Sequence, residues 1–198
     1  MEQQLSMFAA RSSGPPGVEG LVYLADFVAP QRETELLREV DARPWLADLK
    51  RRVQHYGYKY DYKARAIAPS MFVGPLPAFA VELAEQAMAK GLLVELPDQL
   101  IVNEYVPGQG ISKHVDCEPC FKERIITVSL GSACEMEFLP LQEGVAPVAL
   151  ILRPRSALLI SGEARYRWMH QIRGRKSDHG QARERRVSLT FRNVILAA

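Results

Sequence analysis

The sequence predicts a mainly β protein with flanking helices, arranged as a barrel or a double-sheet jelly roll. Two observations lead to this fold class. After Pro97, short runs rich in β-branched and aromatic residues recur with turn residues between them, which is typical of these architectures. Before Pro97, helical patterns dominate instead. The predicted strands of the second part span residues 99–105, 124–131, 134–139, 145–152, 156–161 and 186–196.

The first part of the chain is expected to pack helices on that β core. Residues 1–17 are rich in turn-forming residues and predict a flexible leader. Residues 20–28 predict a strand. Pro30 then begins a helix that continues through residues 31–40, because proline is favoured in the first helical turn. A proline-punctuated loop (69–77) and a second helix (78–90) that stops at Gly91 follow. We therefore expect one domain over residues 18–198, with helices and a lid in 18–97 and the β core in 98–198.

Composition narrows the class of protein. The chain has 198 residues, 47% of them hydrophobic and 24% charged, with a net charge of +2. A chain of this length suffices for one domain with a sizeable core. The small net charge gives no strong overall attraction to nucleic acid. No apolar run approaches the length of a membrane span, and the N-terminus lacks the features of a signal peptide. Three cysteines do not suggest a disulfide framework. We expect a cytoplasmic protein with no membrane partner, and most simply a monomer.

Two histidines and an aspartate are candidate metal ligands. His114 and Asp116 point to the same side if the chain is extended there, because side chains alternate along a strand. His170, 54 positions after Asp116, could close a three-ligand set from a distant strand. Two imidazoles and one carboxylate form the facial triad that holds Fe(II) with open positions. Taken alone, the His-x-Asp pair also fits a hydrogen-bonded surface pair. His179 lies in a polar run and predicts a solvated loop.

The last predicted strand carries a polar face. Arg186, Ser188, Thr190 and Arg192 alternate with apolar residues, so all four share one side of the strand. Arginines inside a barrel are costly unless anions meet them, and a dicarboxylate would satisfy both. Asn103 and Tyr105, also two residues apart, could add neutral hydrogen bonds. The alternative is a solvent-facing strand with charged side chains.

Two further stretches combine cations with other polar groups. Residues 51–65 contain four tyrosines interleaved with cations, a composition suited to stacking on unpaired bases. Alternatively, these tyrosines pack on the core. Residues 173–186 are basic and fit either phosphate contact or an ordinary solvated loop.

Cys117 and Cys120 form a Cys-x-x-Cys pair that could bind zinc or act in redox chemistry. Because no second pair exists, a solvent-facing loop with incidental cysteines is the interpretation we favour.

These motifs, in this order, resemble the AlkB family of Fe(II)- and 2-oxoglutarate-dependent dioxygenases. The resemblance spans about residues 20–194 and includes Asn-x-Tyr, Pro-Gly-Gln-Gly-Ile, His-x-Asp, Ser-Leu-Gly, Gly-Glu-x-Arg-Tyr-x-Trp-x-His and Arg-x-Ser-Leu-Thr-Phe-Arg. It implies a double-stranded β-helix, the jelly roll of this family. Within the family, the sequence is most similar to homologues that hydroxylate a modified wobble uridine in tRNA.

The resemblance also implies a role for each site residue. His114, Asp116 and His170 would bind Fe(II). Arg186 and Tyr105 would bind the distal carboxylate of 2-oxoglutarate, while Asn103 and Arg192 would hold its iron-chelating end. Ser188 stands where the family often has an asparagine. The implied substrate-binding residues are Arg52, Tyr58 and Tyr60 in the lid, Glu118 after the metal ligand, and Arg165, which could instead support Asp116.

The resemblance implies an enzyme that uses O2 and acts on nucleic acid. We expect oxidative demethylation of alkylated bases in DNA or RNA through hydroxylation, with release of succinate, CO2 and an aldehyde. A base within a duplex must be flipped out to reach such a site. One alternative is hydroxylation of a modified wobble uridine in tRNA, or of a protein or small molecule. Another is a non-catalytic jelly-roll binding module.

Overall fold

The computed structural model describes residues 17–47, 50–61 and 64–196. The predicted leader therefore lies outside the described residues, apart from Gly17. The helices are α1 (Pro30–Asp41), α2 (Ala78–Ala89) and the short α3 (Gly162–Tyr166), and a 3-10 turn covers Pro69–Met71. Among the described residues, no helix has the length and apolar character needed to span a membrane.

Most of the remaining structure is β-sheet. The larger sheet contains β1 (Leu21–Leu24), β2 (Val53–Tyr58), β3 (Phe72–Gly74), β4 (Gln99–Tyr105), β6 (Ile125–Gly131), β9 (Ser156–Ile160) and β13 (Arg186–Arg192). The smaller sheet contains β5 (Ile111–His114), β7 (Cys134–Pro140), β8 (Val148–Leu152) and β10 (Trp168–Ile172). A two-stranded hairpin joins β11 (Ser177–Asp178) to β12 (Gln181–Ala182).

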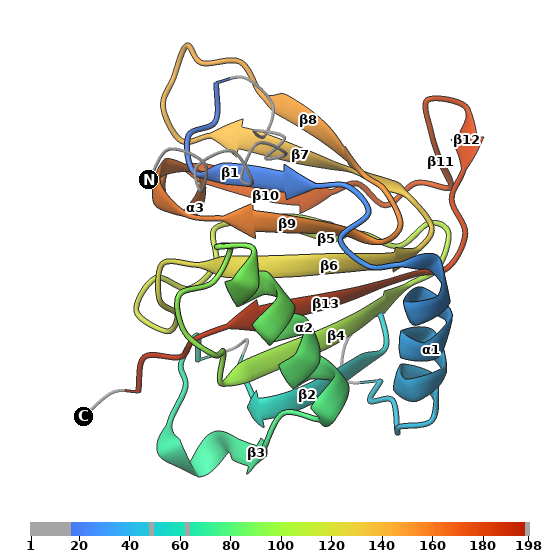
Figure 1. Cartoon of the computed structure of the whole chain (residues 1–198). Helices are drawn as coiled ribbons and strands as arrows, with labels where there is room; N and C mark the ends of the chain where they lie inside the picture. Colours follow the sequence, from blue (N-terminus) through green and yellow to red (C-terminus); the bar gives the residue numbers. More distant parts are fainter. Residues whose placement is uncertain (1–16, 48–49, 62–63, 197–198) are drawn as a thin grey trace, which may run out of the picture.

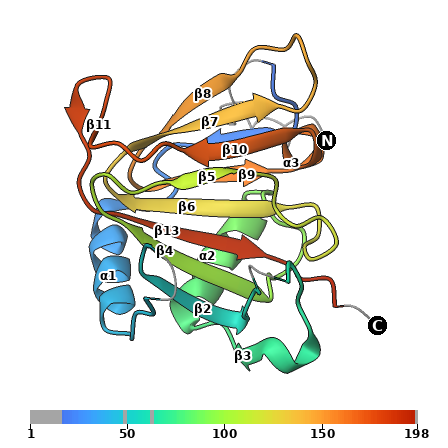
Figure 2. The same ribbon diagram turned by 180° about the vertical axis from the view of Figure 1, so that it is seen from behind.

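Both main sheets are antiparallel. Their strand orders are β1-β9-β6-β13-β4-β2-β3 and β5-β10-β7-β8. Helices α1 and α2 lie on one face of the larger sheet (Figure 1), and both lie behind it when the molecule is turned (Figure 2). The order of the strands along the sheets is far from their order in the chain, so residues distant in sequence meet across each sheet.

The two faces of the larger sheet pack against different partners. In β9, Ala157 and Leu159 belong to the core beneath α1 and α2, whereas Leu158 and Ile160 pack in a second core against the smaller sheet. This alternation follows from the two-residue period of a strand. The smaller sheet therefore covers the face of the larger sheet opposite the helices, and the predicted jelly roll with flanking helices is confirmed.

The helices follow the sequence signals closely. Pro30 occupies the first turn of α1, where its missing N–H costs no helical hydrogen bond, and Leu36 and Val40 one turn apart are fully buried. Helix α2 ends just before Gly91, whose φ of 69° lies in the left-handed region that glycine adopts without strain.

Several elements differ from the sequence prediction, and the strands β2, β5 and β10 were not among those predicted. The predicted strand over residues 20–28 ends at Leu24, because Asp26 turns the chain with a φ of 49°. The proline-rich loop contains the edge strand β3. Helix α3 and the hairpin β11-β12 were not predicted, since each is too short to show a repeating pattern.

Candidate metal and co-substrate site

The three candidate metal ligands meet between the two sheets. His114 is the last residue of β5, and His170 lies opposite it in the paired strand β10. Their ring centroids are 4.3 Å apart. Asp116 lies two residues beyond the end of β5, and its Oδ2 is 3.8 Å from Nε2 of His170. One potential ligand atom from each residue lies within 4.8 Å of the other two. The pairing of β5 with β10 thus joins ligands that are far apart in the sequence.

Hydrogen bonds orient two of these side chains. Nδ1 of His114 lies 2.8 Å from the carbonyl oxygen of Ser112 and donates to it, which leaves Nε2 available to a metal. Nη2 of Arg192 donates to Oδ1 of Asp116 at 2.8 Å, so Oδ2 remains free. His114 and Asp116 are therefore oriented so that one further ligand atom of each can face a metal.

The charges of the site favour the metal-binding forms of these groups. Burial raises the pKa of the Asp116 carboxyl, but Arg192, His170 and His114 lower it more, so the net pKa lies well below its usual range. Burial lowers the pKa of His170 to about 4, against the opposing effect of Asp116. Metals bind carboxylates and neutral imidazoles, so no proton has to leave this pair near neutral pH.

The ligands border a cavity of about 830 Å³ between the sheets. Its floor is the polar face of β13 together with the facing residues of β4. The described residues from these two strands that line it are Ile101, Asn103, Tyr105, Arg186, Ser188, Thr190 and Arg192. The alternation predicted for β13 is confirmed, because Val187, Leu189 and Phe191 point into the core under the helices.

Strand pairing places the candidate co-substrate residues side by side. Arg186 lies opposite Tyr105, and Ser188 lies opposite Asn103. The guanidinium carbon of Arg186 is 5.4 Å from the centre of the Tyr105 ring. Its Nη2 donates to Oγ of Ser129 at 2.8 Å.

Arg186 is nevertheless incompletely paired. Only 3% of the residue is exposed, its buried Nε lacks a hydrogen-bond partner, and it forms no ion pair within the described part of the chain. Nε of Arg192 is also buried without a hydrogen-bond partner. A buried guanidinium is costly unless an anion meets it. The site therefore fits a carboxylate ligand bound beside a metal.

The predicted lid, residues 51–65, contributes a different arginine to the cavity from the one expected. Arg52 forms two hydrogen bonds with the buried carboxylate of Glu104, at 2.5 and 2.7 Å, and its guanidinium lies over the ring of Trp45. It does not line the cavity, so the predicted substrate contact of Arg52 gains no support from this geometry and stays a prediction. Arg51, one residue earlier, lines the cavity instead, and its Nε donates to Oδ1 of Asn103 at 2.8 Å. A shift of one residue in extended chain reverses the face.

The tyrosines of the lid divide between packing and cavity. Tyr60 lines the cavity, and its ring lies 5.4 Å from that of Phe121. Tyr58 packs on Phe72 and on a small core cluster, and it is not among the described residues that line the cavity. Tyr60 packs on the same cluster, so the two tyrosines differ only in that Tyr60 also lines the cavity. Tyr62 lies outside the described residues.

The other two expected substrate contacts do not reach the cavity either. Glu118 is exposed on the loop after Asp116 and is absent from the described cavity lining. Arg165 is 2% exposed and donates to backbone carbonyls of that loop, so its predicted contact with substrate gains no support here and stays a prediction. The alternative for Arg165, support of Asp116, agrees with its position.

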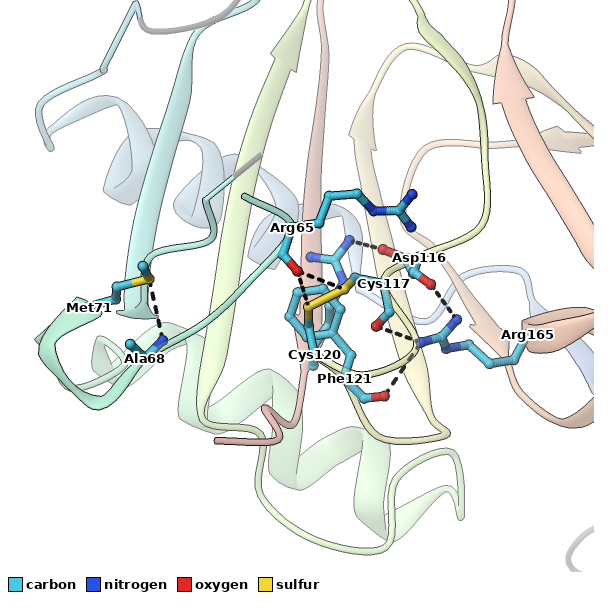
Figure 3. The surroundings of a disulfide bond; sticks show 9 residues. Arg65, Ala68, Met71, Asp116, Cys117, Cys120, Phe121 and Arg165 are labelled. Atoms are coloured by element: carbon cyan, nitrogen blue, oxygen red, sulfur yellow. Dashed lines mark hydrogen bonds and ion pairs between the residues drawn. A yellow bond between two sulfur atoms is a disulfide. The ribbon is translucent and has the colours of Figure 1, made fainter. Parts of the chain in front are cut away.

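One of two expectations about surface loops also needs correction. Cys117 and Cys120 are 4% and 3% exposed and form a disulfide with each other, so they are not incidental cysteines in a solvent-facing loop. Both sulfurs contact the carbonyl oxygen of Arg65 (Figure 3). His179 agrees with its prediction: it lies in an exposed turn with its side chain 70% exposed, and it also contacts Glu135.

The basic stretch over residues 173–186 is largely paired within the protein. Its arginines form ion pairs with carboxylates of β4, β7, α1 and the hairpin. These pairs are Arg173 with Glu137, Arg175 with Glu135 and Asp178, Arg183 with Asp178, and Arg185 with Glu104 and Asp41. Neither a phosphate-binding segment nor a simple solvated loop describes it well.

A family model and several known proteins match this sequence. A family model described as the 2OG-Fe(II) oxygenase superfamily matches residues 20–192. The Arabidopsis thaliana "Alkylated DNA repair protein ALKBH8 homolog" is 38% identical over 203 residues, which cover 89% of this chain and 59% of that protein. The Xenopus tropicalis "tRNA (carboxymethyluridine(34)-5-O)-methyltransferase alkbh8" is 38% identical over 175 residues, covering 86% of this chain but 27% of that protein.

A solved structure supports the fold independently. "The structure of OsALKBH1" superposes with a TM-score of 0.68 at 18% sequence identity, covering 88% of this chain and 96% of that one. At this identity the likeness concerns the fold alone.

The jelly roll and its His-Asp-His cluster define a metal-dependent oxygenase. The chain belongs to the 2OG-Fe(II) oxygenase superfamily and, by its relatives, to the AlkB family within it. It is therefore a 2-oxoglutarate-dependent dioxygenase, and its cofactor and co-substrate are Fe(II) and 2-oxoglutarate.

Proposed function

We propose that this enzyme oxidises an alkyl group on a modified base of DNA or RNA. When the carbon is attached to a ring nitrogen, hydroxylation yields an unstable product that collapses to an aldehyde and the unmodified base. Succinate and CO2 are the products of 2-oxoglutarate. Bound Fe(II), 2-oxoglutarate and O2 supply the oxidising power, and the protein orients and shields the reacting groups.

The observation that carries this proposal is the contrast between the floor and the rim of the cavity. The floor carries the incompletely paired Arg186, and the ligand cluster borders the same cavity between the sheets. The rim carries an aromatic ring and four cations, namely Tyr60, Lys50, Arg51, Arg65 and Lys113. Aromatic faces stack on extruded bases, and cations around them bind the phosphates on either side. This combination favours a nucleotide over a protein side chain.

Each site residue has a role in this proposal. His114, Asp116 and His170 hold Fe(II). Arg186 and Tyr105 bind the distal carboxylate of 2-oxoglutarate. Arg192, which donates to Asp116, and Asn103 hold its chelating end. Ser188 lies between them on the floor and can add a hydrogen bond.

The substrate side of the cavity depends on the lid. Tyr60 stacks on the base, while Arg51 reaches over the edge of the Tyr105 ring, with its guanidinium carbon 5.6 Å from the ring centre. Because the metal cluster lies between two sheets, a base in an intact duplex cannot reach it. The substrate is therefore single-stranded or has its base flipped out.

Hydroxylation of a modified wobble uridine in tRNA is the second candidate. Its support is the identity of 38% to two relatives whose names contain ALKBH8, one of them named for a tRNA carboxymethyluridine activity. In this case the hydroxyl group would stay on the product, and no aldehyde would be released.

One experiment separates these functions. The protein, loaded with Fe(II), is incubated with 2-oxoglutarate and with N-methylated DNA oligonucleotides, N-methylated RNA oligonucleotides or bulk tRNA. Succinate is quantified, and nucleosides are analysed by mass spectrometry. Asp116→Ala is the inactive control. We expect nucleic acid to stimulate succinate release and methylated bases to lose their methyl groups.

The alternatives give different patterns. A nucleoside that gains one oxygen in tRNA, without loss of methyl groups from the oligonucleotides, favours the wobble-uridine hydroxylase. Turnover that no nucleic acid stimulates contradicts both candidates and points to a protein or small-molecule substrate. Complete lack of turnover, even uncoupled, favours a non-catalytic binding module.

A further inference from the structure

Arg165 is a buried cation behind the metal site, and the roles proposed above do not use it. It is 2% exposed and is among the largest fully buried side chains in the described structure. It does not line the cavity, so it is not placed to touch co-substrate or substrate.

Within the described structure, the hydrogen bonds of the Arg165 side chain all go to one loop. Nη1 donates to the carbonyl oxygen of Asp116 at 2.9 Å. Nη2 lies 3.3 Å from the carbonyl oxygen of Cys117 and 3.4 Å from that of Phe121. One planar guanidinium thus spans three acceptors of the segment 116–121, which we call the Asp116 loop. A planar fork of donors holds such acceptors in a fixed relative arrangement.

Arg165 also belongs to the element that supplies another ligand. It lies in α3, which follows β9 and leads after one residue into β10, the strand of His170. Its hydrogen bonds therefore connect the segment that carries His170 directly to the backbone of Asp116. Figure 3 shows Arg165 on one side of the Asp116 loop and Arg65 on the other, with the disulfide between them.

Burying the Arg165 guanidinium costs more free energy than a purely structural contact would require. Arg165 forms no ion pair with a carboxylate in the described part of the chain, and its Nε is buried without a hydrogen-bond partner. The nearest ligand carboxylate, that of Asp116, accepts from Arg192 instead. An apolar side chain would fill the same volume without burying a charge, and such replacements are often neutral or stabilising.

We propose that Arg165 is a positioning residue for the metal site: it fixes the Asp116 carboxylate relative to His170 by holding the backbone of the Asp116 loop. This rests on the proposed metal ligation by Asp116 and His170. Loss of the fork would leave each ligand intact but let the spacing between them vary. Groups that orient metal ligands typically contribute about 10- to 100-fold in metal affinity.

Binding of Mn(II) and Co(II) tests this role without any turnover. Full-length wild type, Arg165→Met and Arg165→Lys are compared with Arg167→Met, a matched control whose exposed arginine lies two residues away. Mn(II) affinity is measured by the paramagnetic resonance of the free ion, and Co(II) geometry by its visible absorption. Thermal melts of the metal-free proteins report stability separately.

We expect Arg165→Met to weaken Mn(II) binding at least about tenfold and to change the Co(II) spectrum. Arg165→Lys keeps the charge but not the fork, so its loss should be smaller yet above about twofold. Arg167→Met should match wild type in both measurements. A change in melting temperature alone, with Mn(II) affinity of Arg165→Met within about twofold of wild type, would overturn the proposal.

Two further outcomes are decisive. If Arg165→Met does not fold, Arg165→Lys decides by the same criterion. If wild type itself binds neither Mn(II) nor Co(II), the metal site fails, and the role of Arg165 fails with it. Wild-type binding that survives in Arg165→Met contradicts only the positioning role, so the two failures are distinguishable.

Discussion

Two buried arginines three residues apart have opposite surroundings. Arg183, beside the hairpin β11-β12, pairs with both carboxylate oxygens of Asp178, at 2.5 and 2.8 Å, and also donates to the carbonyl oxygen of Arg173. Arg186, on the cavity floor, has one neutral hydrogen-bond partner and a buried unpaired Nε. Both are at most 8% exposed, so burial alone does not distinguish them.

We infer from this difference that the charge of Arg183 maintains the fold, whereas the charge of Arg186 serves to bind a ligand. A buried cation that already has its anion contributes to structure, and removing either partner leaves an uncompensated charge. A buried cation without one is stabilised only when an anionic ligand binds. The two faces of β13 also divide in this way: the polar face forms the floor of the cavity, and the apolar face belongs to the core.

The largest expected effect concerns the ligand cluster in the cavity. Asp116→Ala should lower turnover more than about 100-fold, beyond the range for groups that merely orient a ligand. Succinate release from 2-oxoglutarate measures it. Glu118→Ala, an exposed carboxylate two residues later, is the control and should retain activity. Equal loss in both variants would indicate damage to the loop rather than loss of a ligand.

The second effect is on stability at the hairpin. Arg183→Met leaves the buried Asp178 carboxylate without its main partner and should lower the free energy of unfolding by roughly 3–5 kcal/mol. Chemical denaturation measures this change. The affinity of the folded variant for 2-oxoglutarate should not change, and a marked loss of that affinity would contradict the separation of the two regions.

A third effect appears as the pH falls. Burial raises the pKa of Asp178, but hydrogen bonds from Arg183, the Glu135 N–H and Arg175 lower it to about 2. The folded pKa is thus below the unfolded one, so the stabilisation is present above about pH 4 and is lost as the pH falls toward 2. It amounts to about 2 kcal/mol at neutral pH. Asp178→Asn should flatten this acid dependence in pH-dependent denaturation.

The matched control for this pH dependence is Asp26→Asn, because the Asp26 side chain is 76% exposed. Its acid profile should follow that of wild type. If Asp178→Asn instead retains the full acid dependence, the hairpin pair does not contribute the stability assigned to it.

The smallest expected effect is a difference in oligonucleotide binding between variants of two neighbouring arginines of the lid. Arg51→Met should weaken the binding of single-stranded oligonucleotides by about three- to tenfold and reduce its salt dependence by the equivalent of one contact. Arg52→Met should leave that affinity unchanged but lower stability, because Arg52 pairs with the buried Glu104. Fluorescence anisotropy at several salt concentrations measures both, and the opposite ranking would return Arg52 to the substrate side.

Much of the floor of the site was predictable from sequence. The alternation in residues 186–192 predicts which side chains of β13 share a face, because a strand has only two faces. The spacing of Asn103 and Tyr105 places them together for the same reason. His-x-Asp, with a distant histidine, predicts the ligand cluster once a jelly roll is assumed.

The rim and the supporting contacts were harder to predict. Whether Arg51 or Arg52 faces the cavity depends on how this segment pairs with β4. The only local clue was Glu104, which follows Asn103 in the strand and therefore points to the face opposite the cavity. Arg52 pairs with it there. The disulfide and the hydrogen bonds of Arg165 depend on how an irregular loop folds over residues that are 44 to 49 positions away. No periodic pattern encodes such contacts.

Binding of 2-oxoglutarate to the Mn(II)-loaded protein tests the central claim most directly, with wild type and Arg186→Met compared by calorimetry. We predict that wild type binds the dicarboxylate and that Arg186→Met binds it at least about tenfold more weakly, since a bond between charged groups is lost. Its Mn(II) affinity and thermal stability should stay near those of wild type. Equal affinity for 2-oxoglutarate in both proteins would contradict the assignment of the unpaired arginine to the co-substrate.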